Sequence, residues 1–244
     1  MEISKDMEEL HLQAQSNMAQ LTNYYQWSVG FLGQHMGRNI WDAAAGVGIL
    51  AKFLDNKADK LLLTEYTPEN LKILKATFAD SQKHVVEFCD LNQTPADAFK
   101  AHRIDTIINL DVIEHLEDES KALALFHETL VPGGHLLVKT PAHQALYCGI
   151  DEASLHYRRY SKKMLRQRLE AAGFEVVKIQ YMNMPGAMLY FLKGKVLRKK
   201  TNFSNTIKPG GLGLMNRMIP LISKVESVLR PPFGLSVVAV ARKR

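Results

Sequence analysis

Residues 40–48 predict a buried strand that runs into a glycine turn at the start of a helix, because they read Ile-Trp-Asp-Ala-Ala-Ala-Gly-Val-Gly. Such a turn exposes backbone N–H groups and carries few side chains, so an adenosine-bearing cofactor can approach it closely. The acidic Asp42 lies just ahead of Gly46 and Gly48 and favours a cationic ligand over a pyrophosphate. A positively charged sulfonium is the obvious candidate.

Strand and helix patterns alternate along most of the chain, which predicts an α/β fold with a mostly parallel sheet and helices on both faces. The predicted strands cover residues 39–43, 60–65, 85–89, 104–110, 135–140, 174–182 and 235–241. The predicted helices cover residues 47–54, 68–79, 117–130 and 161–172. We expect the last two strands to close the sheet.

The length of 244 residues and the hydrophobic content of 46% suit a single α/β domain. Within it we expect an N-terminal helical lid (1–37), a cofactor-binding core (38–182), a helical insertion (183–234) and a closing strand (235–244). The chain shows no secretory signal and no apolar run of about 18 residues, the length that spans a bilayer. With no export signal, we expect a cytoplasmic protein in which Cys89 and Cys148 are free thiols. Their spacing fits no metal-ligand pattern.

Positive charge is concentrated in one part of the chain. Residues 156–208 contain 13 Lys and Arg against two acidic residues, a local excess of +11, while the whole chain carries +6 and the remainder therefore −5. One interpretation is an acidic partner: a phosphorylated or carboxylated substrate, an acidic carrier protein, an anionic membrane or nucleic acid. The other interpretation is a solvated helix face.

Acidic residues near the predicted strand ends help to identify the cofactor. Residues 46–51 match the dinucleotide fingerprint G-x-G-x-x-G/A, and Glu65 ends the second strand where a carboxylate would bind ribose hydroxyls. Both features also suit a nicotinamide-dependent Rossmann oxidoreductase. Asp90 follows the third strand, however, and Leu-Asp-Val-Ile-Glu-His at 110–115 ends and follows the fourth. An oxidoreductase of that kind predicts no carboxylates at these places, so the set favours a sulfonium-bearing cofactor.

With these residues the chain resembles the class I S-adenosylmethionine (SAM)-dependent methyltransferases over residues 20–182 and the closing strand. Their first motif is acidic-x-Gly-x-Gly-x-Gly, matched at 42–48 except that Ala44 replaces the first glycine. The turn accepts an alanine there if its φ is negative. The resemblance implies SAM as the cofactor and a Rossmann-like, doubly wound, seven-stranded sheet, mostly parallel with an antiparallel last strand.

The resemblance also implies roles for individual residues. Glu65 would bind the ribose hydroxyls, Tyr66 would lie against the adenine, and Asp90 would accept a hydrogen bond from the adenine amino group. Leu110 and Asp111 would line the methionine portion. The expected cofactor-binding residues are Tyr25, Asp42, Ala44, Gly46, Gly48, Glu65, Tyr66, Asp90, Leu91, Leu110, Asp111 and Val112.

Methyl transfer from a sulfonium is a direct displacement, and it needs a base only if the acceptor must lose a proton. His115 is the candidate base, with a structural role as the alternative. We assign no metal ligand. A metal alternative would use Asp111, Glu114, His115 and His143, and it resembles the Glu-x-x-Glu-His motif of metal-assisted RNA ribose methyltransferases, with Asp111 replacing the first Glu.

Substrate recognition is expected from segments outside the common core. Aromatic residues before the first strand suit a lid over the cofactor, or alternatively pack on the sheet. Residues 156–160 read His-Tyr-Arg-Arg-Tyr and resemble a segment of bacterial methyltransferases in natural-product and surface-glycan pathways. One arginine would bind a carboxylate or phosphate, or would instead pair with a helix carboxylate while both tyrosines are core. The expected substrate-binding residues are Tyr24, His156, Tyr157, Arg159 and Tyr160.

The insertion contains two helical stretches, at 184–200 and at 213–230, and Pro220 predicts a kink in the second. They either cover the sheet edge or form a homodimer contact, or they form a Met-rich roof over an apolar substrate or a foothold on an anionic membrane.

The sequence therefore predicts a SAM-dependent methyltransferase of a biosynthetic pathway that methylates a small molecule at a hydroxyl or carboxyl oxygen. An acidic or carrier-tethered substrate, peripheral membrane contact and a homodimer are compatible with it, and no stable nucleic-acid partner is expected. The alternatives are an RNA methyltransferase, metal-assisted or not, the nicotinamide-dependent oxidoreductase, and a noncatalytic adenosyl-binding subunit.

Overall fold

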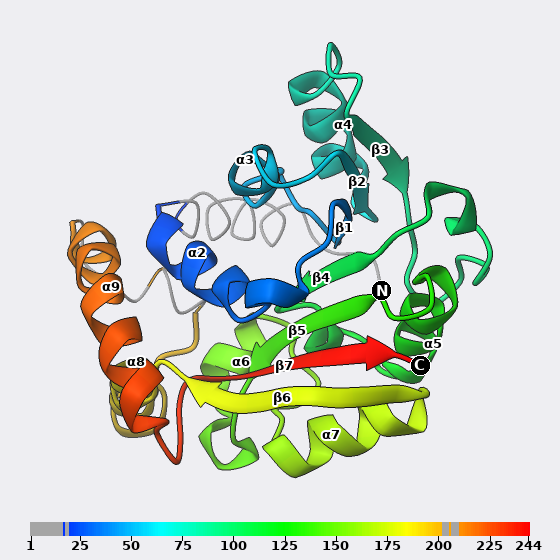
Figure 1. Cartoon of the computed structure of the whole chain (residues 1–244). Coiled ribbons are helices and arrows are strands. Elements are labelled where there is room, and N and C mark those ends of the chain that lie inside the picture. The colour runs from blue at the N-terminus through cyan, green and yellow to red at the C-terminus, as the bar shows by residue number, and fades with distance from the viewer. Residues whose placement is uncertain (1–16, 18–19, 202–204, 206–209) are drawn as a thin grey trace.

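The computed structural model describes residues 17, 20–201, 205 and 210–244. Their centre is a seven-stranded sheet with the strand order β3-β2-β1-β4-β5-β7-β6 (Figure 1). Pairing is parallel from β3 to β5, whereas β7 is antiparallel to both β5 and β6. The strands are β1 (Asn39–Ala43), β2 (Lys60–Glu65), β3 (His84–Phe88), β4 (Thr106–Leu110), β5 (His135–Pro141), β6 (Phe174–Met182) and β7 (Ser236–Lys243). The predicted fold class is confirmed.

Two hydrophobic clusters cover the two faces of the sheet, as expected for a doubly wound fold. One cluster joins Trp41 of β1 to Phe126 of α5 and Leu165 of α7. The other joins Ile40 of β1 to Leu54 of α3 and Leu74 of α4. The helices are α2 (Thr22–Gly30), α3 (Ala51–Leu54), α4 (Pro68–Thr77), α5 (Ser120–Thr129), α6 (Gly149–Ala153), α7 (Lys162–Ala171), α8 (Met184–Phe191) and α9 (Gly211–Leu229).

Local sequence signals explain where several helices begin. Pro68 occupies the first turn of α4, where its missing N–H costs no hydrogen bond. Ser161 caps α7 because its hydroxyl accepts from the Met164 N–H at 3.1 Å. The helix predicted at 47–54 starts only at Ala51, since the left-handed backbone of the preceding glycine turn cannot continue a helix.

The insertion between β6 and β7 forms α8, a π-helical turn at Leu192–Val196, and α9. A buried carboxylate ties the two helices together: Glu226 of α9 accepts from the N–H groups of Asn183 and Met184, at 2.9 and 2.7 Å, at the start of α8. In Figure 1 both helices lie at the edge where β6 ends and β7 begins. No described helix is both long and apolar enough to cross a membrane.

Pro220, where the sequence predicts a kink, lies inside α9 without ending it and changes the hydrogen bonding there. Proline has no N–H, which leaves the carbonyl of Asn216, four residues earlier, without a helical donor. The side chain of Asn23 in α2 donates to that carbonyl at 2.9 Å, and the Asn216 side chain accepts from the Asn23 backbone N–H at 2.8 Å. Pro220 therefore helps to dock α2 on α9.

Residues 1–16, 18 and 19 of the predicted N-terminal lid lie outside the described residues. Its described part includes α2, whose Tyr24 is buried and belongs to the cluster on the α3 and α4 face of the sheet.

Candidate active site

The carboxyl ends of β1 to β4 bring together the acidic residues that the sequence singled out. Glu65 ends β2, while Asp90 and Asp111 directly follow the ends of β3 and β4. Open α/β sheets bind ligands at this edge. The structure therefore places these three predicted cofactor residues at one edge of the sheet.

The glycine turn after β1 has three residues in the left-handed region: Ala44 at φ +65°, Gly46 at +58° and Gly48 at +79°. The expectation of a negative φ at Ala44 is wrong. An alanine in this conformation costs about 1–2 kcal/mol because its Cβ crowds the backbone. Gly48 is also required by packing, since a Cβ there would lie 2.7 Å from the Phe78 ring.

Glu65 closes this turn from the neighbouring strand. One carboxylate oxygen accepts from the Gly46 N–H at 2.8 Å, and the other accepts from the N–H groups of Tyr66 and Thr67 at 3.0 and 2.9 Å. These hydrogen bonds fix the carboxylate beside the turn. Two oxygens held in this way fit the ribose hydroxyls of an adenosine, as the resemblance implies.

Asp42 is almost fully buried, and its Oδ2 has no hydrogen-bond partner among the described residues. Burial raises the pKa of Asp42 to about 7, and the charge of Glu65 adds to the rise. An unpartnered buried carboxylate is costly, and a cation beside it would remove that cost. The residues at this turn therefore fit a cofactor that carries positive charge next to an adenosine.

Because of Asp42, we expect SAM to bind more weakly in mild acid. Below pH 7 the cofactor-free site holds a neutral Asp42, which must release its proton before it can pair with a cation. The Kd of SAM should rise about tenfold for each pH unit below 7 and level off above it. Calorimetry at pH 6, 7 and 8 measures this dependence.

Asp42→Asn is the matched variant for that titration, because its side chain cannot ionise. It should bind SAM weakly at every pH and show no slope. A wild-type Kd that is constant from pH 6 to 8 would contradict the assignment of Asp42 to the cationic part of the cofactor.

The predicted adenine side is a hollow of about 490 Å³ lined by Tyr66, Phe88, Asp90, Gln93, Thr94 and Pro95. The rings of Tyr66 and Phe88 are exposed, with centroids 5.9 Å apart. Asp90 accepts from the Asn92 N–H at 2.8 Å, a loop hydrogen bond that uses one of its oxygens. Leu91 lies in the core, so only its backbone can face a ligand. Phe88, an exposed aromatic residue at the end of a strand, was not predicted as a site residue.

Asp111 connects the cofactor edge to the substrate side. It has φ +55° and accepts a hydrogen bond from Lys139, whose side chain is 2% exposed. Burial alone would lower the pKa of Lys139, but Asp111 raises it above its usual value, so the lysine is charged. Burial raises the pKa of Tyr25 to about 12. The charge of Lys139 lowers this pKa, whereas the charge of Asp111 raises it. The predicted Tyr25 therefore lies beside this pair.

Two more predicted cofactor residues flank Asp111. Leu110 packs against the cluster on the α3 and α4 face of the sheet, and Val112 packs against the cluster on the other face. Their side chains thus turn to opposite faces.

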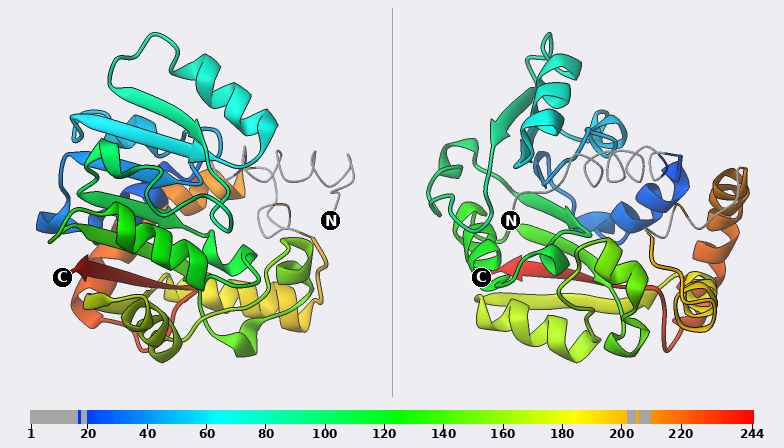
Figure 2. Two further views of the ribbon diagram at one scale, coloured as in Figure 1. Left: turned by 90° about the vertical axis from the view of Figure 1, so that its right-hand side faces the viewer. Right: turned by 180° about the vertical axis from the view of Figure 1, so that it is seen from behind.

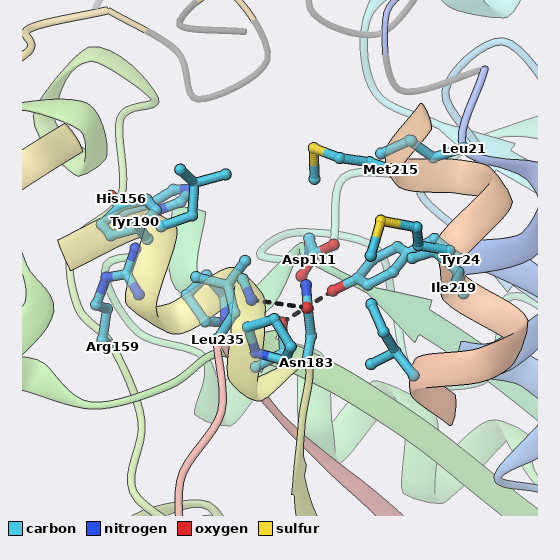
Figure 3. Close-up of a pocket in the computed structure, with 17 residues that line it drawn as sticks. Leu21, Tyr24, Asp111, His156, Arg159, Asn183, Tyr190, Met215, Ile219 and Leu235 are labelled. Atoms are coloured by element: carbon cyan, nitrogen blue, oxygen red, sulfur yellow. Dashed lines mark hydrogen bonds between the residues drawn. The ribbon is translucent and has the colours of Figure 1, made fainter. Parts of the chain in front are cut away.

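A cavity of about 300 Å³ lies between the sheet edge and the insertion (Figure 3). Its walls are mainly apolar side chains of α8 and α9, and Tyr24 contributes from α2, where its hydroxyl is hydrogen-bonded to that of Ser236 at 3.3 Å. Asp111, which follows β4 at the edge of the sheet where the predicted cofactor residues lie, also lines the cavity. The lining residues are Leu21, Tyr24, Asp111, Pro141, His156, Arg159, Asn183, Pro185, Gly186, Leu189, Tyr190, Met215, Met218, Ile219, Ile222, Leu235 and Ser236.

A buried polar network lies at one end of this cavity, where His156, Arg159 and Tyr190 line it. All three donate to the fully buried carboxylate of Asp151: Arg159 Nε at 2.7 Å, the Tyr190 hydroxyl at 2.7 Å and His156 Nδ1 at 3.0 Å. When Nδ1 donates to Asp151, the neutral form of the His156 ring carries its lone pair on Nε2. Asp151 was not predicted as a functional residue.

The predicted base His115 is exposed and does not line the cavity. Its ring packs edge-on against His156, with centroids 4.7 Å apart. His115 thus contacts a second histidine that does line the cavity.

The remaining residues of the 156–160 segment separate into three environments. Tyr157 is exposed, and Tyr160 is fully buried in the core, where its hydroxyl donates to the Ile113 carbonyl at 3.4 Å. Neither lines the cavity, so their predicted contact with substrate is not supported. Arg158 pairs with Glu119 of the α5 N-terminus, which was the alternative for one of the arginines. Arg159 reaches the cavity but is committed to Asp151.

The four residues of the metal alternative do not meet. Glu114 and His115 do lie together, but the third potential ligand within 4.8 Å is His156. Asp111 pairs with Lys139, and the ring of His143 packs on Tyr181 at 4.4 Å. The set that includes Asp111 and His143 is therefore wrong.

Comparison with known proteins agrees with this geometry. Residues 14–179 match a family described as a methyltransferase domain. A probable SAM-dependent methyltransferase of Mycolicibacterium smegmatis is 28% identical over 142 residues, which are 57% of this chain and 53% of that protein. A ubiquinone biosynthesis O-methyltransferase of Cereibacter sphaeroides is 26% identical over 106 residues, 43% of this chain and 41% of that protein. The chain thus spans about half the length of these curated relatives.

Among solved structures, phosphoethanolamine N-methyltransferase 2 of Haemonchus contortus, in complex with SAM, has the same fold with a TM-score of 0.60. It is 16% identical, and the alignment covers 91% of this chain and 52% of that one. The family match over more than half of the chain decides against the nicotinamide-dependent oxidoreductase. The chain belongs to the methyltransferase-domain family, and its fold is that of the class I SAM-dependent methyltransferases.

Proposed function

We propose that this enzyme transfers the methyl group of SAM to a hydroxyl or carboxyl oxygen of an apolar small molecule in a biosynthetic pathway. The observation that carries the proposal is the cavity beside Asp111, whose walls are the apolar inner faces of α8 and α9. Apolar walls with a few polar groups at one end are typical of sites for small organic molecules. The O-methyltransferase relative supports an oxygen acceptor.

SAM, when bound, supplies a methyl carbon whose bond to sulfur breaks as the acceptor oxygen bonds to it, the electron pair staying on sulfur. The chain holds the acceptor against this carbon and excludes water, which is most of what such a displacement needs. A hydroxyl acceptor must also lose its proton, and we propose that Nε2 of His156 accepts it. Asp151 orients the ring through Nδ1. His115 would then support His156 through ring packing.

Of the two acceptors, the charges around the cavity favour a neutral hydroxyl over a carboxylate. Arg159, the cationic side chain on the cavity wall, is 2% exposed and already paired with Asp151 at 2.7 Å. Lys139 is paired with Asp111. An acidic or carrier-tethered acceptor would have to compete with these pairs.

Filling the cavity should slow methylation strongly without weakening the binding of the cofactor. Met215 of α9 is half-buried and lines the cavity, so Met215→Trp should lower transfer from tritiated SAM to an alkyl-substituted phenol at least tenfold. The Kd of SAM should change less than twofold, because Met215 does not belong to the glycine turn.

Leu214→Trp is the matched control, since the neighbouring side chain is 63% exposed. It should transfer methyl groups like the wild type. Wild-type turnover by Met215→Trp, or transfer to total RNA but to no alkylphenol, would contradict the proposed acceptor site.

A further inference from the structure

The outer side of α9 carries a continuous apolar stripe. Leu214, Met218, Leu221, Val225 and Val228 recur every three or four residues, so they lie on one face of the helix. Their exposed fractions range from 45 to 78%. A helix that packs on a protein core normally turns such a stripe inward. Here the inward face is separate, since Leu212, Ile219 and Glu226 are buried.

Exposed apolar side chains continue on the neighbouring element. Met188, Phe191 and Leu192 are exposed on α8 and at the start of the π-helical turn, and Val196 and Leu197 are exposed at its end. Figure 1 and the right view of Figure 2 show α8 and α9 next to each other at one end of the molecule. We call these five residues and the α9 stripe the outer apolar surface. Large apolar side chains exposed in such number on two neighbouring helices are typical of an interaction site.

The charges near the outer apolar surface indicate which kind of partner it binds. The described residues of the range 184–230 include eight Lys and Arg and a single acidic residue, Glu226. Glu226 is buried, where it caps α8, so it offers no negative charge to a partner. Arg217 and Lys224 lie seven residues apart beside the α9 stripe and are exposed. Apolar residues flanked by cations, without exposed acids, complement an anionic lipid surface.

The same two helices also form the cavity. Leu189 and Tyr190 of α8 and Ile222 of α9 line its wall. Met218 belongs to both surfaces, because it lines the cavity and is 50% exposed. An apolar molecule dissolved in a bilayer thus has an apolar route into the cavity along Met218.

We propose that the outer apolar surface docks the enzyme peripherally on an anionic bilayer, which is the source of its apolar acceptor. The supply of acceptor from the bilayer rests on the proposed function, whereas docking rests only on the exposed residues. The stripe of α9 would lie in the headgroup region, parallel to the membrane.

Co-sedimentation of the full chain with large unilamellar vesicles tests docking. Vesicles of phosphatidylcholine with 30% phosphatidylglycerol should bind the protein at least tenfold more tightly than vesicles of pure phosphatidylcholine, and 0.5 M NaCl should weaken the binding. The vesicles contain neither SAM nor acceptor, so the result is independent of turnover. No binding to the anionic vesicles would overturn the proposal.

Two variants separate the apolar and charged contributions. Leu221→Asp/Val225→Asp and Arg217→Gln/Lys224→Gln should each weaken binding to the anionic vesicles at least tenfold, since these side chains are exposed and their replacement leaves the core intact. Thermal unfolding checks that both fold. The controls Ile73→Asp and Lys72→Gln/Lys75→Gln change exposed residues of α4 and should bind like the wild type. Equal binding by all four variants would overturn the proposed surface.

Vesicle binding can also be separated from acceptor binding and from dimerisation. Met215→Trp, with its filled cavity, should bind vesicles like the wild type, so a failure of the proposed acceptor leaves docking intact. The wild type could instead form a dimer, fail to bind vesicles, and become a monomer in Leu221→Asp/Val225→Asp. That result would assign the outer apolar surface to a second copy of the chain and overturn the proposal of membrane docking.

Discussion

Replacing Asp151 with asparagine is expected to lower the free energy of unfolding by about 3–5 kcal/mol, the usual cost of removing one partner of a buried ion pair. Asp151 is fully buried, and Arg159 beside it is 2% exposed. Asparagine would leave the guanidinium without a counter-charge and could not accept all the hydrogen bonds that His156, Tyr190 and Arg159 donate. For a chain of this length the midpoint of thermal unfolding should fall by about 10 °C.

The pKa of Asp151 supports the same expectation. Burial alone would raise the pKa of this carboxyl, but the hydrogen bond from His156 and the charge of Arg159 hold it below its usual value. Its stabilising effect is therefore present at neutral pH and is lost only as the pH falls through the lowered pKa. The comparison with the variant should be made near pH 7.

Glu175→Gln provides the control for Asp151→Asn. Glu175 also accepts from an arginine, Arg242, at 2.7 Å, but the two side chains are 38 and 48% exposed. Water and salt screen such a pair, so its removal should cost less than about 1 kcal/mol. Similar losses of stability for Asp151→Asn and Glu175→Gln would contradict a buried network centred on Asp151.

The strands were predictable from the sequence because buried parallel strands are short apolar runs with polar or glycine boundaries. Each predicted strand agrees with the structure within two residues at either end. The carboxyl ends of such strands share one edge, so the cofactor residues followed from the strands. The helix after β1 began later than predicted, since the alternation of residue types does not reveal that Ala44 joins Gly46 and Gly48 at positive φ.

The substrate side was less predictable because its contacts join distant parts of the chain. Tyr190 donates to Asp151 across 39 residues, and nothing local in the sequence relates the two. The same limit explains why His143 was grouped with Glu114 although His156 is its neighbour. One useful signal was overlooked: Lys139 lies at the end of an apolar strand, and a buried lysine needs a carboxylate partner.

His156→Gln should lower kcat about 100-fold or more for a hydroxyl acceptor, the usual contribution of a general base. His156 lines the cavity, and its Nδ1 donates to Asp151, which leaves Nε2 as the acceptor for a proton. The Kd of SAM should stay within twofold of the wild type, because His156 does not contact the glycine turn. Single-turnover rates with an alkylphenol measure the effect.

His115→Gln is the matched comparison, because the two rings touch but His115 does not line the cavity. It should reduce kcat less than tenfold if His115 only supports its neighbour. If the kcat of His115→Gln were lower than that of His156→Gln, His115 and not His156 would be the base. His156→Ala leaves space for an imidazole, so added imidazole should restore part of the rate. A residue that only shapes the cavity would show no such rescue, because a free base could not replace it.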